Sequence, residues 1–148
     1  MEIKEINIDD IIYMNEIVEM EKSTFGRFGG VDLWILKPMV KFGKVFVALK
    51  DEKVIGAAEF MIAFDRNDAF LYGFSVMEKF QRHGVGRNLL SYCEQYFKER
   101  GVKTMSLTVD PKNKRAITLY QHMNYIIESL EINEYEEGVD RYRMKKFL

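Results

Sequence analysis

The sequence has few of the residues that stabilise small secreted domains or hold structural metals. Its 148 residues include one cysteine, Cys93, and two histidines. One cysteine cannot form an internal disulfide, and no Cys/His set has the spacing of a zinc site, so we expect no metal and a reduced, cytoplasmic setting. Only two prolines are present, and no Pro- or Ser-rich linker divides the chain. Residues 1–148 are therefore predicted to form a single domain.

Long apolar runs are also missing. The first residues lack the basic and apolar stretches of a signal peptide. The most apolar stretch, Val54 to Phe64, is interrupted by Glu59 and falls short of the ~20 residues that a membrane helix needs. The sequence therefore predicts no membrane partner.

Positive and negative charges nearly balance, with 22 Lys and Arg against 23 Asp and Glu. The distribution is uneven, however. Residues 1–21 carry seven acids and one lysine, whereas residues 78–115 carry nine bases and four acids. A basic segment in a nearly neutral protein favours a local anionic ligand and argues against a nucleic-acid partner. The acidic segment, by the same reasoning, could attract a cationic amine.

Hydrophobic residues make up 47% of the chain, and their periodicity predicts alternating strands and helices. Asp9 or Asp10 is expected to cap the first helix, in which Ile11, Met14, Ile17 and Val18 recur on one stripe. Further helices are expected at 31–41, 86–100 and 110–124, and strands at 2–8, 44–50, 53–64, 69–77, 103–109, 125–135 and 140–147. This order is typical of an α/β fold with a mixed sheet covered by helices.

A candidate anion site follows the strand that ends near residue 77. Gly84 and Gly86 punctuate the turn before a helix begins, so backbone N–H groups and the helix dipole face the same ligand. Arg82, His83 and Arg87 add donors, and a phosphate or pyrophosphate is the expected ligand. The turn is not a P-loop or a dinucleotide fingerprint, because no Gly-Lys-Ser/Thr follows and Leu89 stands at the third glycine position. An ordinary tight turn is the competing interpretation.

Two motifs in this part of the chain resemble those of a known family. The run Gln81–Gly86 (Gln-Arg-His-Gly-Val-Gly) resembles the Q/R-x-x-G-x-G/A signature of the GNAT superfamily of acetyl-CoA-dependent N-acetyltransferases. Asn113–Tyr120 is similar to the N-x-x-A-x-x-L-Y element of the same superfamily. The chain departs from the pattern at Glu78, Arg82 and Asn124, where the family often has proline, glycine and glycine. Asparagine tolerates the left-handed conformation better than most residues, so its departure is mild.

The resemblance implies a central mixed, mostly antiparallel sheet flanked by helices and acetyl-CoA as co-substrate. It implies that one strand splays from its neighbour and offers main-chain groups to the pantetheine arm, that the glycine turn holds the pyrophosphate, and that Asn113 binds the arm. The cofactor-binding residues expected on this basis are Phe74, Ser75, Val76, Gln81, Arg82, His83, Gly84, Val85, Gly86, Arg87, Asn113 and Tyr120.

Two residues are predicted to be catalytic. The resemblance implies that Tyr120 points at the thioester sulfur. A phenol in this position can protonate the leaving thiolate. Glu59 is the candidate base, because a carboxylate in the middle of an apolar strand is out of place unless it serves a cavity or faces solvent. Asp68, Glu78 and water are its rivals. Cys93 lies on an apolar helix stripe, which favours packing over a covalent acetyl-enzyme and hence direct attack by the amine.

The expected function is transfer of an acetyl group to a primary amine of a small molecule or a peptide. A protein N-terminal acetyltransferase is an alternative, weakened by Thr108 at a position where that subfamily tends to carry glutamate. A non-catalytic acyl-CoA-binding domain is a second alternative, disfavoured by the intact Asn113 and Tyr120. The resemblance also allows a homodimer. It places the acceptor pocket near Phe25, Phe28, Trp34 and Tyr135, although core packing is favoured for Trp34.

Overall fold

The structure is a computed structural model that describes residues 1–26 and 30–148. Seven strands form one sheet in the order β1-β2-β3-β4-β5-β7-β6, in which β4 and β5 are parallel and the other neighbours are antiparallel. The strands are β1 (Glu2–Glu5), β2 (Lys44–Lys50), β3 (Lys53–Ala63), β4 (Asp68–Val76), β5 (Thr104–Val109), β6 (Ile126–Glu131) and β7 (Arg141–Phe147). The predicted mixed, mostly antiparallel sheet is confirmed.

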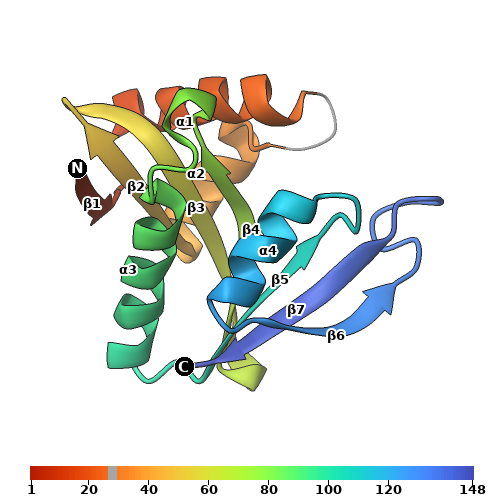
Figure 1. Ribbon diagram of the computed structural model, residues 1–148. Coiled ribbons are helices and arrows are strands. Elements are labelled where there is room, and N and C mark those ends of the chain that lie inside the picture. The colour runs from red at the N-terminus through yellow and green to blue at the C-terminus, as the bar shows by residue number, and fades with distance from the viewer. Residues whose placement is uncertain (27–29) are drawn as a thin grey trace.

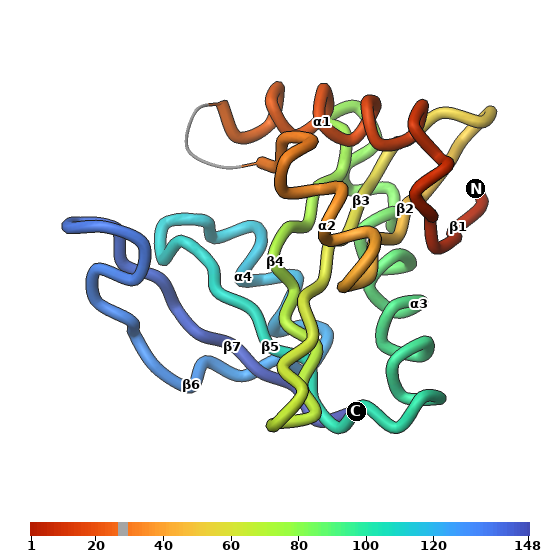
Figure 2. Tube along the Cα trace, turned by 180° about the vertical axis from the view of Figure 1, so that it is seen from behind, coloured from red at the N-terminus to blue at the C-terminus, as the bar shows by residue number. Residues whose placement is uncertain are grey.

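Helices cover both faces of the sheet (Figure 1). They are α1 (Ile11–Phe25), α2 (Leu33–Phe42), α3 (Val85–Glu99) and α4 (Lys114–His122). Helices α1 and α2 pack on one face, where Met14, Ile17 and Leu36 are fully buried, and are seen in front in the view from behind (Figure 2). Helices α3 and α4 pack on the other face, around Leu89, Leu90 and Met105 among others. The expected order of helices and strands is confirmed.

Several boundaries and side chains differ from the expectation. The first strand ends at Glu5, because Asn7 and Asp10 form a turn in which the Asp10 carboxylate accepts from the Asn7 N–H (2.8 Å) and does not cap α1. Ile11, predicted on the buried stripe, is 54% exposed, and Trp34, for which core packing was favoured, is 90% exposed. Both face outward because α1 and α2 are the outermost layer.

The later elements also begin and end differently. Helix α4 starts at Lys114 and not at 110, since the Asn113 side chain caps it by accepting from the Ala116 N–H (3.2 Å). The strand expected over 125–135 ends at Glu131. Asn124 follows α4 with φ 71°, which is the left-handed conformation that asparagine was expected to tolerate.

The sheet opens between its two parallel strands. Residues Asp68–Leu71 of β4 pair with Thr104–Leu107 of β5, and the pairing stops there. At the closed end, the buried Asp68 carboxylate accepts from the hydroxyls of Thr104 (2.7 Å) and Ser106 (2.5 Å). The rest of β4, from Tyr72 to Val76, is paired only with β3, so β5, β7 and β6 diverge from it (Figures 1 and 2). The predicted splay at residues 74–76 is therefore present and begins at Tyr72.

Within the described ranges, none of the helices combines the length and the apolar character that crossing a bilayer requires.

Candidate active site

The turn between β4 and α3 has the geometry of an anion site. A short 3-10 turn, η2 (Glu78–Phe80), leads into Arg82 and Gly84, which both have positive φ (64° and 80°). Gly84 is the N-cap of α3 and supplies no side chain to the first-turn N–H groups. Those N–H groups thus remain available to an external acceptor at the positive end of the helix dipole. The left-handed Arg82 also explains why glycine is frequent at this position of the motif.

The two motif segments contact each other at this turn. The Gln81 side chain donates from Nε2 to the Val76 carbonyl oxygen (2.9 Å) and accepts through Oε1 from the Arg115 guanidinium. Gln81 therefore ties the end of β4 to the first turn of α4. The side-chain oxygen of Asn113 caps α4, as described above, so this residue's contribution to a ligand comes from the rest of its amide. Arg82, His83 and Arg87 are exposed around the turn.

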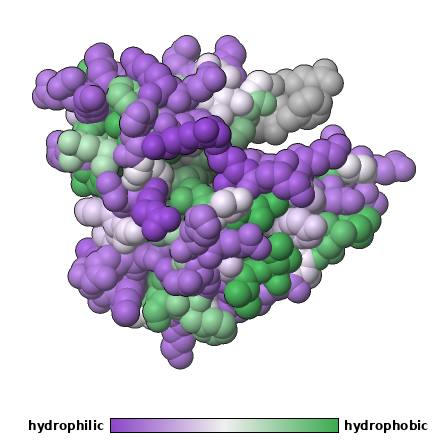
Figure 3. Space-filling model, in the orientation of Figure 1, coloured by the Kyte–Doolittle hydropathy of each residue, from purple (hydrophilic) through white to green (hydrophobic). Residues whose placement is uncertain are grey.

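Tyr120 lies beside the open part of β4. The Tyr120 ring lies 6.2 Å from the Phe74 ring and 5.8 Å from the Tyr125 ring, measured between centroids. Tyr120 is 6% exposed, and burial raises the pKa of its phenol above the ordinary value. The hydroxyl therefore keeps its proton at neutral pH, as a general acid must. In the space-filling view, hydrophilic side chains surround a hollow between the start of α3 and α4 (Figure 3).

Glu59 belongs to β3, and its side chain lies beside the open part of β4, on the face of the sheet opposite Tyr120. It is paired with Gly73 in the sheet next to a bulge at Tyr72, and its carboxyl group covers the space where residue 73 would carry a Cβ atom. Glu59 is fully buried, and neither of its carboxyl oxygens has a hydrogen-bond partner within residues 1–26 and 30–148. Burial, and next the neighbouring Glu21, raise the pKa of Glu59 well above its ordinary value.

Glu21 is the residue of this site that sequence reasoning missed. It lies in the last part of α1, is fully buried, and accepts from the Val31 N–H (2.8 Å) and the Ser75 hydroxyl (3.3 Å). The signal was present in the sequence, because residue 21 falls on the buried stripe of α1, four residues after Ile17 and seven after Met14. An acidic residue on such a stripe requires a partner or a function.

The other candidates lie elsewhere. Asp68 is at the closed end of the β4–β5 pair with both oxygens hydrogen-bonded, and Glu78 is exposed at the start of η2. Cys93 is fully buried, and burial raises the pKa of its thiol well above the ordinary value, which agrees with packing. His122 is exposed at the end of α4. Of Glu59, Asp68 and Glu78, Glu59 is the one that is buried with no hydrogen-bond partner among the described residues.

The acidic segment is largely used within the fold. Glu5 pairs with Lys44 (2.7 Å), and Glu16 pairs with Lys53 (3.3 Å) and accepts from the Val54 N–H (2.9 Å). Of the remaining acids of this segment, Glu2, Asp9 and Glu19 are exposed, whereas Glu21 is buried. Of the residues expected to form the acceptor pocket, Tyr135 lies 3.3 Å from the Thr108 hydroxyl, whereas Phe28 lies outside the described residues.

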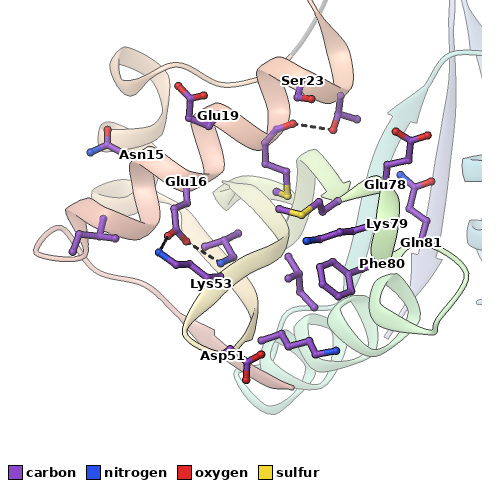
Figure 4. Close-up of a pocket in the computed structure, with 17 residues that line it drawn as sticks. Asn15, Glu16, Glu19, Ser23, Asp51, Lys53, Glu78, Lys79, Phe80 and Gln81 are labelled. Atoms are coloured by element: carbon purple, nitrogen blue, oxygen red, sulfur yellow. Dashed lines mark hydrogen bonds and ion pairs between the residues drawn. The ribbon is translucent and has the colours of Figure 1, made fainter.

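An open groove of about 1360 Å³ lies on the α1 side of the turn (Figure 4). It runs between α1, the β2–β3 hairpin and residues 77–81. Glu16 and Lys53 face each other across one part of it, and Lys79 and Phe80 reach into it from the turn (Figure 4). Gln81 is the one predicted cofactor-binding residue in its lining. The groove therefore borders the anion site without coinciding with it.

The chain resembles known acetyltransferases in sequence. A model described as the acetyltransferase (GNAT) family matches residues 14–125. The chain is 31% identical over 96 residues to the [ribosomal protein bS18]-alanine N-acetyltransferase of Salmonella typhimurium, an alignment that covers 63% of this chain. The chain spans 64% of the length of that relative.

Solved structures share the fold. The ribosomal-protein-S18-alanine N-acetyltransferase from Escherichia coli superposes with a TM-score of 0.83 and 21% identity, covering 99% of this chain and 92% of that one. An aminoglycoside 6'-N-acetyltransferase complexed with coenzyme A gives a TM-score of 0.83 and 15% identity, covering 99% and 97%.

Proposed function

Because this chain belongs to the acetyltransferase (GNAT) family, we propose that it transfers the acetyl group of acetyl-CoA to a primary amine by direct attack. The observation that carries the proposal is the open part of β4. There, consecutive residues place the carboxyl group of Glu59 at Gly73 on one face and the phenol of Tyr120 beside Phe74 on the other. An acid and a base on two sides of one accessible strand are what amide formation from an amine and a thioester requires.

The residues present fit acetyl-CoA. The uncapped start of α3, the left-handed Gly84 and the exposed Arg82 and Arg87 suit a pyrophosphate, and the free edge of β4 offers main-chain groups to an amide-bearing arm. When bound, acetyl-CoA supplies an activated acetyl thioester. Main-chain groups of Phe74, Ser75 and Val76 would hold its pantetheine arm, and Phe74 lies beside the Tyr120 ring.

The chain's own residues manage the protons. A primary amine with a pKa near 10 is charged at neutral pH and must lose a proton before it can attack. Glu59 accepts that proton, because burial raises the pKa of its carboxyl group and so makes it a stronger base than an ordinary carboxylate. Tyr120 gives its proton to the departing sulfur and regains one from the nitrogen that has formed the amide.

A second candidate is acetylation of a peptide α-amine. The names of the Salmonella and Escherichia coli proteins described above favour it, since both are alanine N-acetyltransferases of a ribosomal protein. Thr108, at a position where the N-terminal acetyltransferase subfamily tends to carry glutamate, weakens this candidate without excluding it. The two candidates share the site and differ in the acceptor.

A thiol-release assay tests the proposal. The protein is incubated with acetyl-CoA and a panel of polyamines, amino acids, aminoglycosides and short peptides that begin with alanine. We expect release that depends on at least one amine, and peptide-dependent release would favour the second candidate. Stoichiometric CoA binding without amine-dependent release would contradict both.

A further inference from the structure

Two buried carboxyl groups converge at the bulge of β4. Glu59 reaches this point from β3 and Glu21 from α1, and both side chains are 0% exposed. The carboxyl group of Glu59 occupies the space beside Gly73, and Glu21 Oε1 lies 3.6 Å from the same point. A Cβ atom on residue 73 would force the carboxyl group of Glu59 to shift, whereas Glu21 Oε1 would remain at ordinary contact distance.

Within residues 1–26 and 30–148, no basic side chain forms an ion pair with either acid. Glu21 accepts two hydrogen bonds, from the Val31 N–H and the Ser75 hydroxyl, whereas the Glu59 oxygens accept none from the described part of the chain. Two adjacent buried carboxylates cannot both stay ionised, so the pair must hold a proton or a cation.

The pair lies against the part of β4 that has a free edge. Gly73 and Ser75 belong to that part, which has no partner on the β5 side. Tyr72 flanks the pair, and the pKa of its phenol is raised, first by burial and then by Tyr135, Glu21, Glu59 and Asp32.

We propose that Glu21 and Glu59 form a single proton-sharing pair that binds the acceptor as a primary ammonium ion. This inference rests on the proposed function and names the form in which the acceptor binds. An ammonium group has three donors and no acceptor, which suits the two Glu59 oxygens that accept no hydrogen bond from the described residues. A neutral amine or a carboxylate would leave the pair's charge unbalanced.

The proton balance is simple. With one proton shared, the pair carries one negative charge and attracts the ammonium ion. One N–H bond of the ammonium then breaks, and an O–H bond forms on the pair, which leaves a neutral amine beside two protonated carboxyl groups. The proton returns to solvent when the product leaves.

The experiment uses methylammonium chloride as the smallest primary ammonium, with tetramethylammonium chloride as the matched cation that has no N–H donor. The midpoint of thermal unfolding of the whole protein is measured at constant ionic strength. We expect saturable stabilisation by methylammonium only. Glu59→Gln and Glu21→Gln should each weaken the apparent affinity on the order of tenfold to a hundredfold. Glu19→Gln, an exposed position on the same helix, should leave it unchanged.

A second measurement does not depend on the variants. In the unmodified protein, the stabilisation by methylammonium should disappear as the pH falls and both acids become protonated. Equal effects of the two cations, or stabilisation that survives in the Glu21→Gln and Glu59→Gln variants, would overturn the inference. If methylammonium binds but no amine supports thiol release, the proposed function fails while the ammonium site stands. If thiol release proceeds without methylammonium binding, the ammonium site is refuted while the proposed function stands.

Discussion

Replacing Glu59 by glutamine changes how the stability of the protein depends on pH. A carboxyl group whose pKa is raised by folding binds more protons in the folded state than in the unfolded state, so it makes the protein less stable as the pH rises. The effect of Glu59 is absent below its unfolded pKa of about 4.5, grows between that value and the raised folded value, and is constant above it. Glutamine does not titrate and removes this dependence.

The magnitude follows from one proton. Within the window, each pH unit changes the free energy of unfolding by about 1.4 kcal/mol per proton. Relative to the unmodified protein, the Glu59→Gln variant should therefore gain about 1.4 kcal/mol for each unit by which the pH rises, until the folded pKa is passed. For a chain of this size, that gain corresponds to about 3–6 °C in the unfolding midpoint.

Urea unfolding followed by far-ultraviolet circular dichroism measures this difference. The single tryptophan, Trp34, is 90% exposed and is a poor fluorescence reporter of the core. Glu21→Gln should shorten the pH window without changing its slope, because it removes a negative neighbour of Glu59 and leaves the burial that is the larger cause of the raised pKa. Glu19→Gln should track the unmodified protein. Parallel pH profiles of the unmodified protein and Glu59→Gln would refute the raised pKa, and an unchanged window in Glu21→Gln would show that burial acts alone.

Three further predictions concern the turn, the acid and a hairpin. Arg87→Glu should weaken CoA binding, measured by calorimetry, on the order of tenfold or more, because an acid in the first turn of α3 repels phosphate. The unfolding midpoint should stay unchanged or rise, because an acid there suits the helix dipole. Lys98→Glu, at the other end of the helix, should leave CoA affinity unchanged. Tyr120→Phe should lower kcat about 10²- to 10⁴-fold with native circular dichroism, and an unaltered kcat would remove Tyr120 from the mechanism. Asp51 and Glu52 both have positive φ in the β2–β3 turn. Glycine adopts this conformation without strain, so Glu52→Gly should raise the free energy of unfolding by about 1 kcal/mol. A loss of stability in urea unfolding would contradict the assigned turn.

Much of the fold was predictable because local patterns agree with tertiary packing. The strands at 44–50 and 53–63 and the helix from residue 85 to 99 lie within a residue or two of their expected bounds. Predictions failed where a side chain has a local alternative. Asn113 caps α4 and so delays its start, and Asp10 bonds backward to Asn7 and so does not cap α1.

The site was predictable in part for the same reason. The glycine turn and Tyr120 lie on contiguous motifs, and an acid inside an apolar strand drew attention to Glu59. The convergence of Glu21 with Glu59 depends on how α1 crosses the bulge of β4, which no local pattern specifies. Similarly, Gly73 reads as an ordinary strand glycine until the carboxyl group beside it is seen.

The central claim is that this chain acetylates an amine across the open part of β4. The most direct measurement incubates the protein with isotopically labelled acetyl-CoA and the amine panel and detects labelled N-acetyl product by mass spectrometry. The account predicts a labelled amide from at least one amine, with formation strongly reduced in both Tyr120→Phe and Glu59→Gln. The absence of labelled amide from every amine tested, with CoA binding intact, would contradict it.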